Sequence, residues 1–310
     1  RPVCLVARAG AGGSDALSSP GEAAAASRGI FLILTANLLF AGMDAVSKTL
    51  VADYPVAQIL WVRYAFFALF ATVLSLRGAG PLAGFRSRRP GLNLLRAGIL
   101  VVEIACFVLA FRYLQLAEVH SIAAVYPLVI TALSALVLGE FVGPRRWAAV
   151  AVGFVGVVVI LRPGLGVFDP AALIALAGAG LFSVYQILTK VIARHDGMTT
   201  ILLYTGWVGF ALTSIAGPFY WTPPDLQGWI MLLVAGVFGV IGHMLLIKAL
   251  EAAPASVLQP FNYTLLVWAT VVGFLVFGDL PDAVTAAGAG IVVASGLYTW
   301  WRERVRARGG

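Results

Sequence analysis

The sequence carries the same pattern of polar and apolar residues twice, which indicates a chain built from two copies of one unit. The aligned stretches are 39–48 with 181–190, 114–117 with 250–253, and 137–140 with 276–279, at spacings of 142, 136 and 139 residues. Within the first stretch, Asp44 and Lys48 correspond to Gln186 and Lys190. A duplication of this kind inside a strongly apolar chain predicts a repeated helical architecture in a membrane.

The composition places most of the chain in lipid. Of the 310 residues, 61% are hydrophobic and 11% are charged, and the mean hydropathy is +0.95, which is far more apolar than a soluble globular protein. The net charge of +7 comes largely from arginines in short clusters between apolar runs. These clusters are typical of the loops that orient a membrane protein, so we expect no nucleic-acid partner. Cys4 and Cys106 lie far apart, so we expect neither a disulfide framework nor a cysteine metal site.

Ten apolar segments follow Arg28, each close to the roughly 20 residues that a helix needs to cross a hydrocarbon core. We predict an all-α membrane protein with ten transmembrane helices. The expected helices are residues 29–50, 56–76, 92–113, 117–138, 144–161, 170–191, 199–219, 227–249, 255–277 and 283–301. Residues 1–27 are expected to form a disordered cytoplasmic tail, residues 302–310 a basic one, and the first helix an uncleaved anchor.

The distribution of Lys and Arg between successive loops predicts the orientation. With the N-terminus inside, the inner loops hold most of the basic residues, and the outer loops hold only Arg112 and Arg162 near helix ends. Because Lys and Arg set orientation, both termini are expected in the cytoplasm. Each unit, 28–162 and 169–301, has five crossings, so the second begins on the opposite side of the membrane. The units are then inverted repeats, which provide two nearly equal conformations for alternating access.

Several motifs in order along this frame are similar to those of a known family. They are 138–140 (Leu-Gly-Glu), 160–164 (Ile-Leu-Arg-Pro-Gly), 253–256 (Ala-Pro-Ala-Ser), 259–261 (Gln-Pro-Phe) and Trp268. Together they resemble EamA-type transporters of the drug/metabolite transporter superfamily, over residues 29–301. The resemblance implies a bacterial inner-membrane transporter with a central cavity lined by helices 1–4 and 6–9. It does not name the cargo, because the family transports amino acids, riboflavin, S-adenosylmethionine, nucleobases and drugs.

Charged side chains at membrane depth are candidates for binding or coupling, because burying an unsatisfied charge in hydrocarbon is costly. Glu103 lies near the midpoint of the third predicted helix. It could bind a cationic group, carry a proton, or stay protonated and hydrogen-bonded within the bundle. Asp44 and Lys48 are four residues apart on one helix face, so they could pair with each other or contact substrate. Gln186 occupies the place of Asp44 in the second repeat.

Two further charged or titratable residues lie inside predicted helices. Arg63, between aromatic neighbours, could hold a carboxylate or phosphate, pair with Asp44, or extend to the outer surface. His243, beside Gly239 and Gly242, could couple transport to protons or serve as a hydrogen-bonded packing residue.

Prolines inside the fourth and ninth predicted helices predict kinks near polar and aromatic groups. Pro127 follows Tyr126, and Pro260 follows Gln259 and precedes Asn262 and Tyr263. Kinked or broken helices are where many transporters bind substrate, although a kink can also serve packing alone. Tyr185 is a further candidate as a stacking surface for a planar ring.

These observations predict a secondary active transporter for a small metabolite, with a riboflavin-like vitamin, S-adenosylmethionine or an amino acid as candidate cargo. Proton coupling through Glu103 or His243 is a hypothesis. The alternatives are a passive channel or a non-transporting scaffold. We expect no enzyme activity, cofactor or metal, because no phosphate loop or metal-binding spacing is found. The expected partners are substrate, membrane lipid and a second copy through the fifth and tenth helices.

Overall fold

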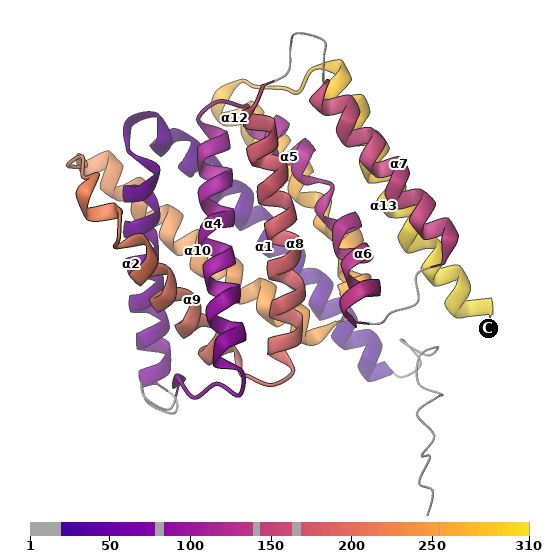
Figure 1. Ribbon diagram of the computed structural model, residues 1–310, viewed down its shortest axis with the longest axis horizontal. Coiled ribbons are helices and arrows are strands. Elements are labelled where there is room, and N and C mark those ends of the chain that lie inside the picture. The colour runs from indigo at the N-terminus through magenta and orange to yellow at the C-terminus, as the bar shows by residue number, and fades with distance from the viewer. Residues whose placement is uncertain (1–19, 78–83, 139–142, 163–168, 254, 310) are drawn as a thin grey trace, which may run out of the picture.

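The computed structural model describes residues 20–77, 84–138, 143–162, 169–253 and 255–309. This part of the chain is helical and contains no β-strand (Figure 1). The helices are α1 Pro20–Asp53, α2 Val56–Leu76, α4 Pro90–Phe111, α5 Leu116–Ala123, α6 Tyr126–Leu138, α7 Pro144–Leu161, α8 Ala171–Ala193, α9 Met198–Thr213, the 3-10 helix η1 Gly217–Phe219, α10 Leu226–Ala252, α11 Ala255–Asn262, α12 Thr264–Phe277 and α13 Ala283–Gly309. The predicted all-helical class is confirmed.

Seven of the described helical stretches are long and apolar enough to cross a membrane. They belong to α1, α2, α4, α5 with α6, α8, α10, and α11 with α12. Three shorter apolar helices accompany them, over Trp147–Leu161, Met198–Thr213 and Ala283–Tyr298. The length and hydropathy of these helices confirm a protein with multiple membrane-spanning segments.

Several helix ends differ from the sequence prediction. Helix α1 begins at Pro20, so residues 20–27 are helical, whereas the rest of the predicted tail lies outside the described residues. At the other end, α13 continues to Gly309. The seventh predicted helix is shorter than expected, because α9 ends at Thr213 and Pro218 lies in the separate turn η1. Proline lacks an amide donor and restricts the residue before it, so a helix approaching Pro218 tends to end.

Two stretches that the sequence predicts as single helices are broken in the middle. The first break separates α5 from α6 just before Pro127, and the second, at Tyr263, separates α11 from α12 shortly after Pro260. Side chains from α1 and α8 contact carbonyl groups at these breaks. Asn37 donates to the Phe261 carbonyl at 3.0 Å, and the Ser183 hydroxyl contacts the Tyr126 carbonyl at 3.3 Å. The predicted kinks are confirmed as breaks with polar support.

The helices pack in pairs along their lengths. Helix α1 lies along α10, α4 along α8, and α2 along α9. Helices α7 and α13 form a separate pair at the edge of the bundle (Figure 1). The backbones of that pair approach closely at Gly156 and Gly288, where a Cβ on either residue would lie 2.8 Å from the carbonyl oxygen of the other. Small residues on both helices, Gly156 on α7 and Gly288 on α13, therefore allow the two backbones to come close.

One ion pair joins the end of α7 to the start of α13. Arg162 adopts the left-handed conformation with φ 46° and ends α7. Its guanidinium group donates to the carboxylate of Asp282 and to the Thr285 hydroxyl. The same carboxylate accepts the Thr285 amide at 2.7 Å. The hydrogen bond from Arg162, followed by the one from the Thr285 amide, lowers the pKa of the Asp282 carboxyl below its usual range.

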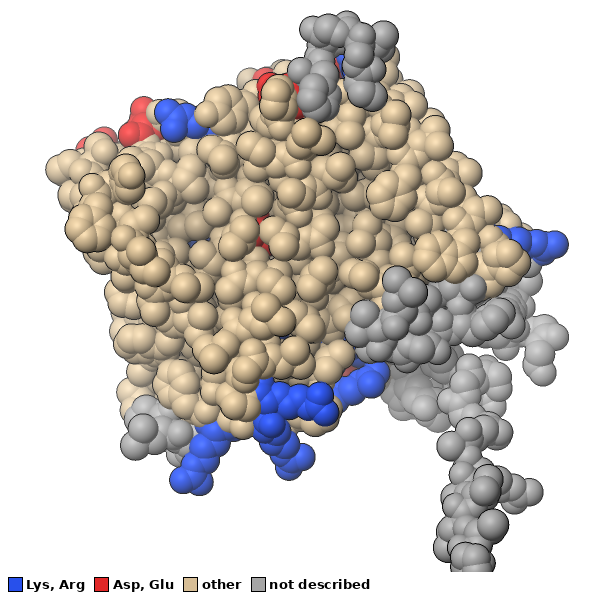
Figure 2. All heavy atoms as spheres, in the orientation of Figure 1, with Lys and Arg blue, Asp and Glu red and all other residues tan. Residues whose placement is uncertain are grey.

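Charged side chains are separated toward the two ends of the bundle. Figure 2 shows Lys and Arg clustered along the lower edge, acidic side chains mainly along the upper edge, and a broad uncharged band between them. Exposed arginines lie where α2 and α8 end, at Arg77, Arg86, Arg88, Arg89 and Arg194. Exposed carboxylates lie at the opposite helix ends, at Asp53, Asp225 and Asp282.

A methyl group added at the α7–α13 contact should destabilise the protein. In Gly156→Ala, the new Cβ meets the Gly288 carbonyl and Val292, and overpacking of this kind costs about 1–3 kcal/mol. The control Gly290→Ala places its Cβ in open space on the same helix pair and should leave stability equal or up to about 1 kcal/mol higher. Thermal unfolding in detergent measures both; equal melting temperatures for the two variants would contradict the contact.

The Arg162–Asp282 pair should stabilise the protein only above acidic pH. Because the pKa of the Asp282 carboxyl is lowered in the fold, its stabilising effect is present above the ordinary Asp value of about 3.9 and is lost as the pH falls through the lower folded pKa. The melting temperature of wild type should therefore exceed that of Asp282→Asn at pH 7, and the gap should close below about pH 4. A gap that stays constant with pH would contradict this assignment.

Candidate functional site

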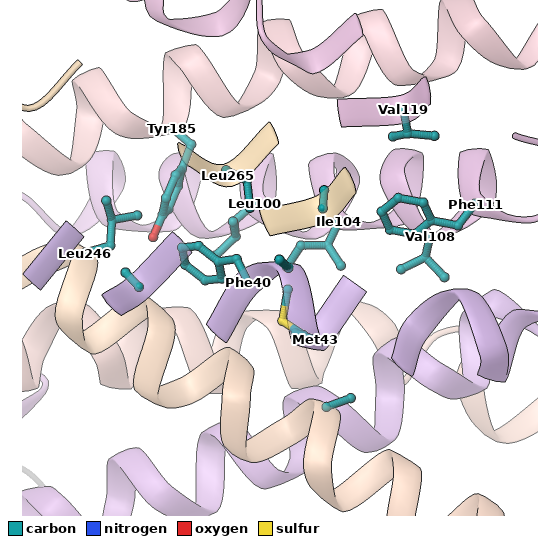
Figure 3. Close-up of a cluster of buried hydrophobic side chains, with 14 of the residues drawn as sticks. Phe40, Met43, Leu100, Ile104, Val108, Phe111, Val119, Tyr185, Leu246 and Leu265 are labelled. Atoms are coloured by element: carbon teal, nitrogen blue, oxygen red, sulfur yellow. The ribbon is translucent and has the colours of Figure 1, made fainter. Parts of the chain in front are cut away.

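A cavity lies among the helices in the middle of the bundle, with an empty space of about 560 Å³ including its opening. Eight helices line the cavity: α1, α2, α4, α5, α6, α8, α10 and α12. All of them except α12 contribute a charged, titratable or aromatic side chain, and α12 contributes Leu265. The lining residues are Phe40, Met43, Asp44, Arg63, Glu103, Ile104, Phe107, Val108, His120, Ala123, Tyr126, Phe182, His243 and Leu265. Figure 3 shows the apolar side of this region, where Phe40 lies beside Tyr185, and Met43 and Ile104 lie on the other side of Phe40.

Asp44 contacts His120 across the cavity. The Oδ2 atom of Asp44 lies 3.2 Å from the Nε2 atom of His120. The His120 ring is buried and stacks against Phe107, with centroids 6.4 Å apart and an interplanar angle of 11°. Helix α5 holds this ring in place and begins with a capping box made by Gln115 and Glu118. The sequence analysis did not single out His120; the available signal was a titratable residue inside a predicted helix.

Lys48 does not form the expected pair with Asp44. Its ammonium group donates to the Leu114 carbonyl at 2.7 Å, beyond the end of α4. Lys190 makes the corresponding contacts in the second half of the chain, with the carbonyls of Leu250 and Ala253. The last carbonyls of a helix lack intrahelical donors and carry partial negative charge. Leu250 and Ala253, the partners of Lys190, lie at the end of α10, whereas Leu114 lies in the connection between α4 and α5.

Glu103 and Arg63 line the cavity as buried charges that do not touch. Their exposed fractions are 5% and 3%. Arg63 therefore does not extend to the surface, and its Nη2 atom contacts the sulfur of Met43. Within the part of the chain that the structure describes, no salt bridge joins Arg63 to Glu103 or Asp44. The cavity thus combines two carboxyl groups and a guanidinium group that remain separate.

His243 is buried among aromatic rings beside the cavity. Its Nδ1 atom lies 3.5 Å from the Tyr185 hydroxyl, and the ring of Phe40 lies edge-on with centroids 5.1 Å apart. The space that Gly239 and Gly242 leave is filled by other residues: a Cβ at Gly239 would lie 3.2 Å from the Arg63 Nε atom, and one at Gly242 would meet Phe40. These glycines therefore make room for side chains facing His243.

Arg96 is a buried residue that the sequence analysis did not single out. It is fully buried, and its Nη2 atom donates to the Ile201 carbonyl at 3.0 Å and to the Thr205 hydroxyl at 2.6 Å. Its guanidinium carbon lies 5.3 Å from the centroid of the Tyr185 ring, a distance suited to a cation–π contact. The signal available was an arginine one turn inside a predicted helix.

The remaining predicted site residues lie away from the cavity lining, except Tyr126. Asn262 donates to the Gln259 side chain at 3.0 Å, and the Tyr126 hydroxyl reaches the Asn262 carbonyl at 3.4 Å. Tyr263 is buried at the break between α11 and α12. Gln186 is buried with exposed fraction 3% and lies next to Tyr185 on α8. The structure thus groups Gln259, Asn262 and Tyr263 with Tyr126 at the second helix break.

Comparisons with known proteins concern the family and the fold of the chain. The sequence profile described as the EamA-like transporter family matches the chain twice, over residues 27–162 and 169–300. A solved structure described only as a crystal structure of a protein superposes with a TM-score of 0.68 at 19% identity, covering 90% of this chain and 99% of that chain. At this identity, the structural likeness speaks for the fold alone.

Three bacterial relatives have named cargo. The riboflavin transporter of Vibrio cholerae serotype O1 is 29% identical over 286 residues, which is 91% of this chain and 96% of that protein. The S-adenosylmethionine uptake transporter of Rickettsia bellii is 26% identical over 71% of this chain and 75% of that protein. The pseudopaline exporter CntI of Pseudomonas aeruginosa is 27% identical over 86% of this chain and 94% of that protein.

A double-mutant cycle should show that Asp44 and His120 stabilise each other. Removing either partner leaves a buried polar group unpaired, so Asp44→Asn and His120→Ala should each lower the melting temperature, with a coupling free energy of about 1–3 kcal/mol. Thermal unfolding of the purified protein gives all four values. His195→Ala, at an exposed histidine, is the control and should change little. Strictly additive effects of Asp44 and His120 would show that their contact has no energetic importance.

Proposed function

The chain belongs to the EamA-like transporter family, and from that premise we propose that it is a secondary carrier that moves a small metabolite by alternating access through the central cavity. The family relatives are transporters, and the chain is a multi-span membrane transporter. The observation that carries the proposal is that three charged side chains, the half-buried Asp44 and the buried Arg63 and Glu103, line one cavity without a salt bridge between them in the described part of the chain. Charges at membrane depth are costly and mark substrate or ion pathways.

We propose ten crossings arranged as two inverted repeats, 28–162 and 169–301. The packing pairs support this assignment. Exchanging the repeats turns the α1–α10 pair into the α8–α4 pair, whereas α2 with α9 and α7 with α13 each pair with their own counterpart. The contacts of Lys48 with Leu114 and of Lys190 with Leu250 are also equivalent under this exchange. Such symmetry gives each half the ability to adopt the conformation of the other.

Polar contacts between the halves at each end of the bundle suit the two gates of such a carrier. At one end, Asp196 accepts hydrogen bonds from the Asn93 side chain at 2.7 Å and from the Arg88 amide at 2.8 Å. At the other end, Gln58 exchanges two hydrogen bonds with the Thr222 backbone, at 2.7 and 2.8 Å. Alternating access requires these two sets of contacts to open in turn. We assign the end with Arg88 to the cytoplasm because of its excess of arginine, which places both termini inside.

Within the cavity, we propose separate roles for the charged and aromatic groups. Glu103 and Asp44 receive a positive or hydrogen-donating part of the cargo, while Tyr126 and His243 help to enclose it. Lys48, Tyr185, Gln186, Gln259, Asn262 and Tyr263 support the geometry of the cavity and of the helix breaks. Glu103 also carries the coupling proton, because its carboxyl group faces the cavity without a hydrogen-bond partner among the described residues.

The named cargo of the relatives provides the candidates for this chain. Riboflavin and S-adenosylmethionine each contain a planar heterocycle, and pseudopaline is the named cargo of an exporter. The rings of Phe40, Phe107 and Phe182 line the cavity beside the charged groups, so a flat ring could stack there. We propose a cargo of this amphipathic kind, with import and export set by the gradients.

Transport assays in proteoliposomes test this function. With riboflavin, S-adenosylmethionine and an amino-acid panel as probes, wild type should transport at least one compound at a rate that depends on the pH gradient. Glu103→Gln should lower the initial rate about tenfold or more and abolish the pH dependence, because it removes the proposed binding and coupling carboxyl.

The matched control for this experiment is Glu251→Gln. Glu251 lies exposed near the end of α10, away from the cavity lining, and its replacement should leave the rate within about twofold of wild type. A Glu103→Gln protein that keeps the rate and pH dependence of wild type would refute the role of Glu103. Failure of wild type to move any probe would argue against this cargo class.

A further inference from the structure

Beside the cavity, several buried hydrogen-bond donors have no acceptor among the described residues. They are the Nη1 atom of Arg63, the hydroxyl of Tyr64, the Nε and Nη1 atoms of Arg96, and the Nε2 atom of Gln186. Each of these residues has an exposed fraction of 3% or less. They extend from α2, α4 and α8. Three helices of the bundle thus carry buried donors that have no acceptor among the described residues.

These donors lie near one another; other buried donors without an acceptor, among them Arg162 Nε and the Tyr263 hydroxyl, lie at the end of α7 and at the α11–α12 break. Tyr64 lies within electrostatic range of both Arg63 and Arg96, and so does the ring of His243. Arg96 lies over the ring of Tyr185, the residue that precedes Gln186 on α8. Arg63 itself faces the cavity. The region is therefore an extension of the cavity wall toward Arg96.

The carboxylates of the cavity do not satisfy these donors. Asp44 contacts His120, and within the described residues no salt bridge joins Glu103 to Arg63 or Arg96. A buried donor without a partner costs about 1–3 kcal/mol, and more when it is charged. Two guanidinium groups held in this way would destabilise the protein unless another group binds them.

We propose that Arg63, Arg96, Tyr64 and Gln186 form a subsite that binds an oxyanion of the cargo, either a carboxylate or a phosphate. Arg63 contacts the anion from the cavity, and Arg96 approaches it from behind. A guanidinium fork fits the oxygens of either group, and tyrosine and amide donors complete the shell. This inference rests on the proposed function, because it identifies one end of the transported molecule. The carboxyl groups of Asp44 and Glu103 face the other end.

The subsite also explains why Arg63 is kept apart from the carboxyl groups of the same cavity. A direct salt bridge would neutralise Arg63 and leave it no capacity for a ligand. Gly239 prevents crowding here, because a Cβ at that position would lie 3.2 Å from the Arg63 Nε atom. The contact of the Nη2 atom with the Met43 sulfur holds one branch of the guanidinium group and leaves Nη1 available.

Binding to matched pairs of compounds tests the subsite. The pairs are riboflavin 5′-phosphate with riboflavin, and tryptophan with tryptamine; sodium acetate and inorganic phosphate, compared with chloride, serve as probes without a ring. In wild type, the member that carries the oxyanion should bind about tenfold or more tightly than its partner in at least one pair. The pair that shows the preference distinguishes a phosphate from a carboxylate. Arg63→Gln should reduce the preference to below about twofold, whereas Arg112→Gln, at an exposed arginine, should retain it.

A stability measurement keeps the inference testable even when binding is weak. If Arg63 is held for a ligand, Arg63→Met without added anion should melt at the same temperature as wild type or higher, because it removes an unpaired buried charge. Phosphate or acetate should raise the melting temperature of wild type and not of this variant. A large loss of stability in Arg63→Met would show that Arg63 is structural and would overturn the inference.

The remaining outcomes separate this inference from the proposed function. Two results would overturn the subsite: wild type shows no preference for any oxyanion, or the preference persists in Arg63→Gln. In either case the unpaired donors would be hydrated only. Transport of a probe without such a preference would leave the proposed function standing. An intact preference in a protein that transports no probe would contradict the proposed function and leave the subsite supported.

Discussion

The absence of water in the hydrocarbon core is the constraint on which this structure depends, because every polar group there must find a partner within the protein. The two broken helices meet this constraint through the other half of the chain. Asn37 on α1 contacts the break between α11 and α12, and Ser183 on α8 contacts the break between α5 and α6. Each break is therefore stabilised by a helix from the other half of the chain, which couples the geometry of the two halves.

The same constraint separates structural charges from functional ones. Lys48 binds the Leu114 carbonyl between α4 and α5, and Lys190 binds the Ala253 carbonyl at the end of α10, so each pairs with a backbone acceptor. Arg96 joins α4 to α9 through one of its nitrogens while two others lack acceptors. Glu103 and Arg63 lie at the cavity without pairing. The two lysines are thus paired with carbonyl groups, whereas Arg63 has an unpaired nitrogen at the cavity wall and Arg96 has two beside it.

The sequence predicted elements that depend on local pattern and missed contacts that depend on packing. Apolar length placed the helices, and Pro127 and Pro260 placed the breaks, because both are properties of a short segment. The pairing of Asp44 with His120 joins residues far apart in the sequence, so the sequence pattern offered only Lys48, Arg63 or substrate as its partner. Arg96 was missed for a related reason: only its position against Thr205 and Tyr185 shows that it lies inside the bundle.

The proposed duplication also implies that the two end states of the carrier differ in energy. At the repeat spacings, Asp44 corresponds to Gln186, Arg63 to Thr205, and Glu103 to Gly239. The first repeat therefore supplies the charged groups of the cavity, and the second supplies neutral or small ones. Identical halves would make the inward-open and outward-open states equal in energy. With the charges confined to one half, a bound ligand or proton interacts differently with the two states and shifts their populations, whereas the gradients set the direction of net transport.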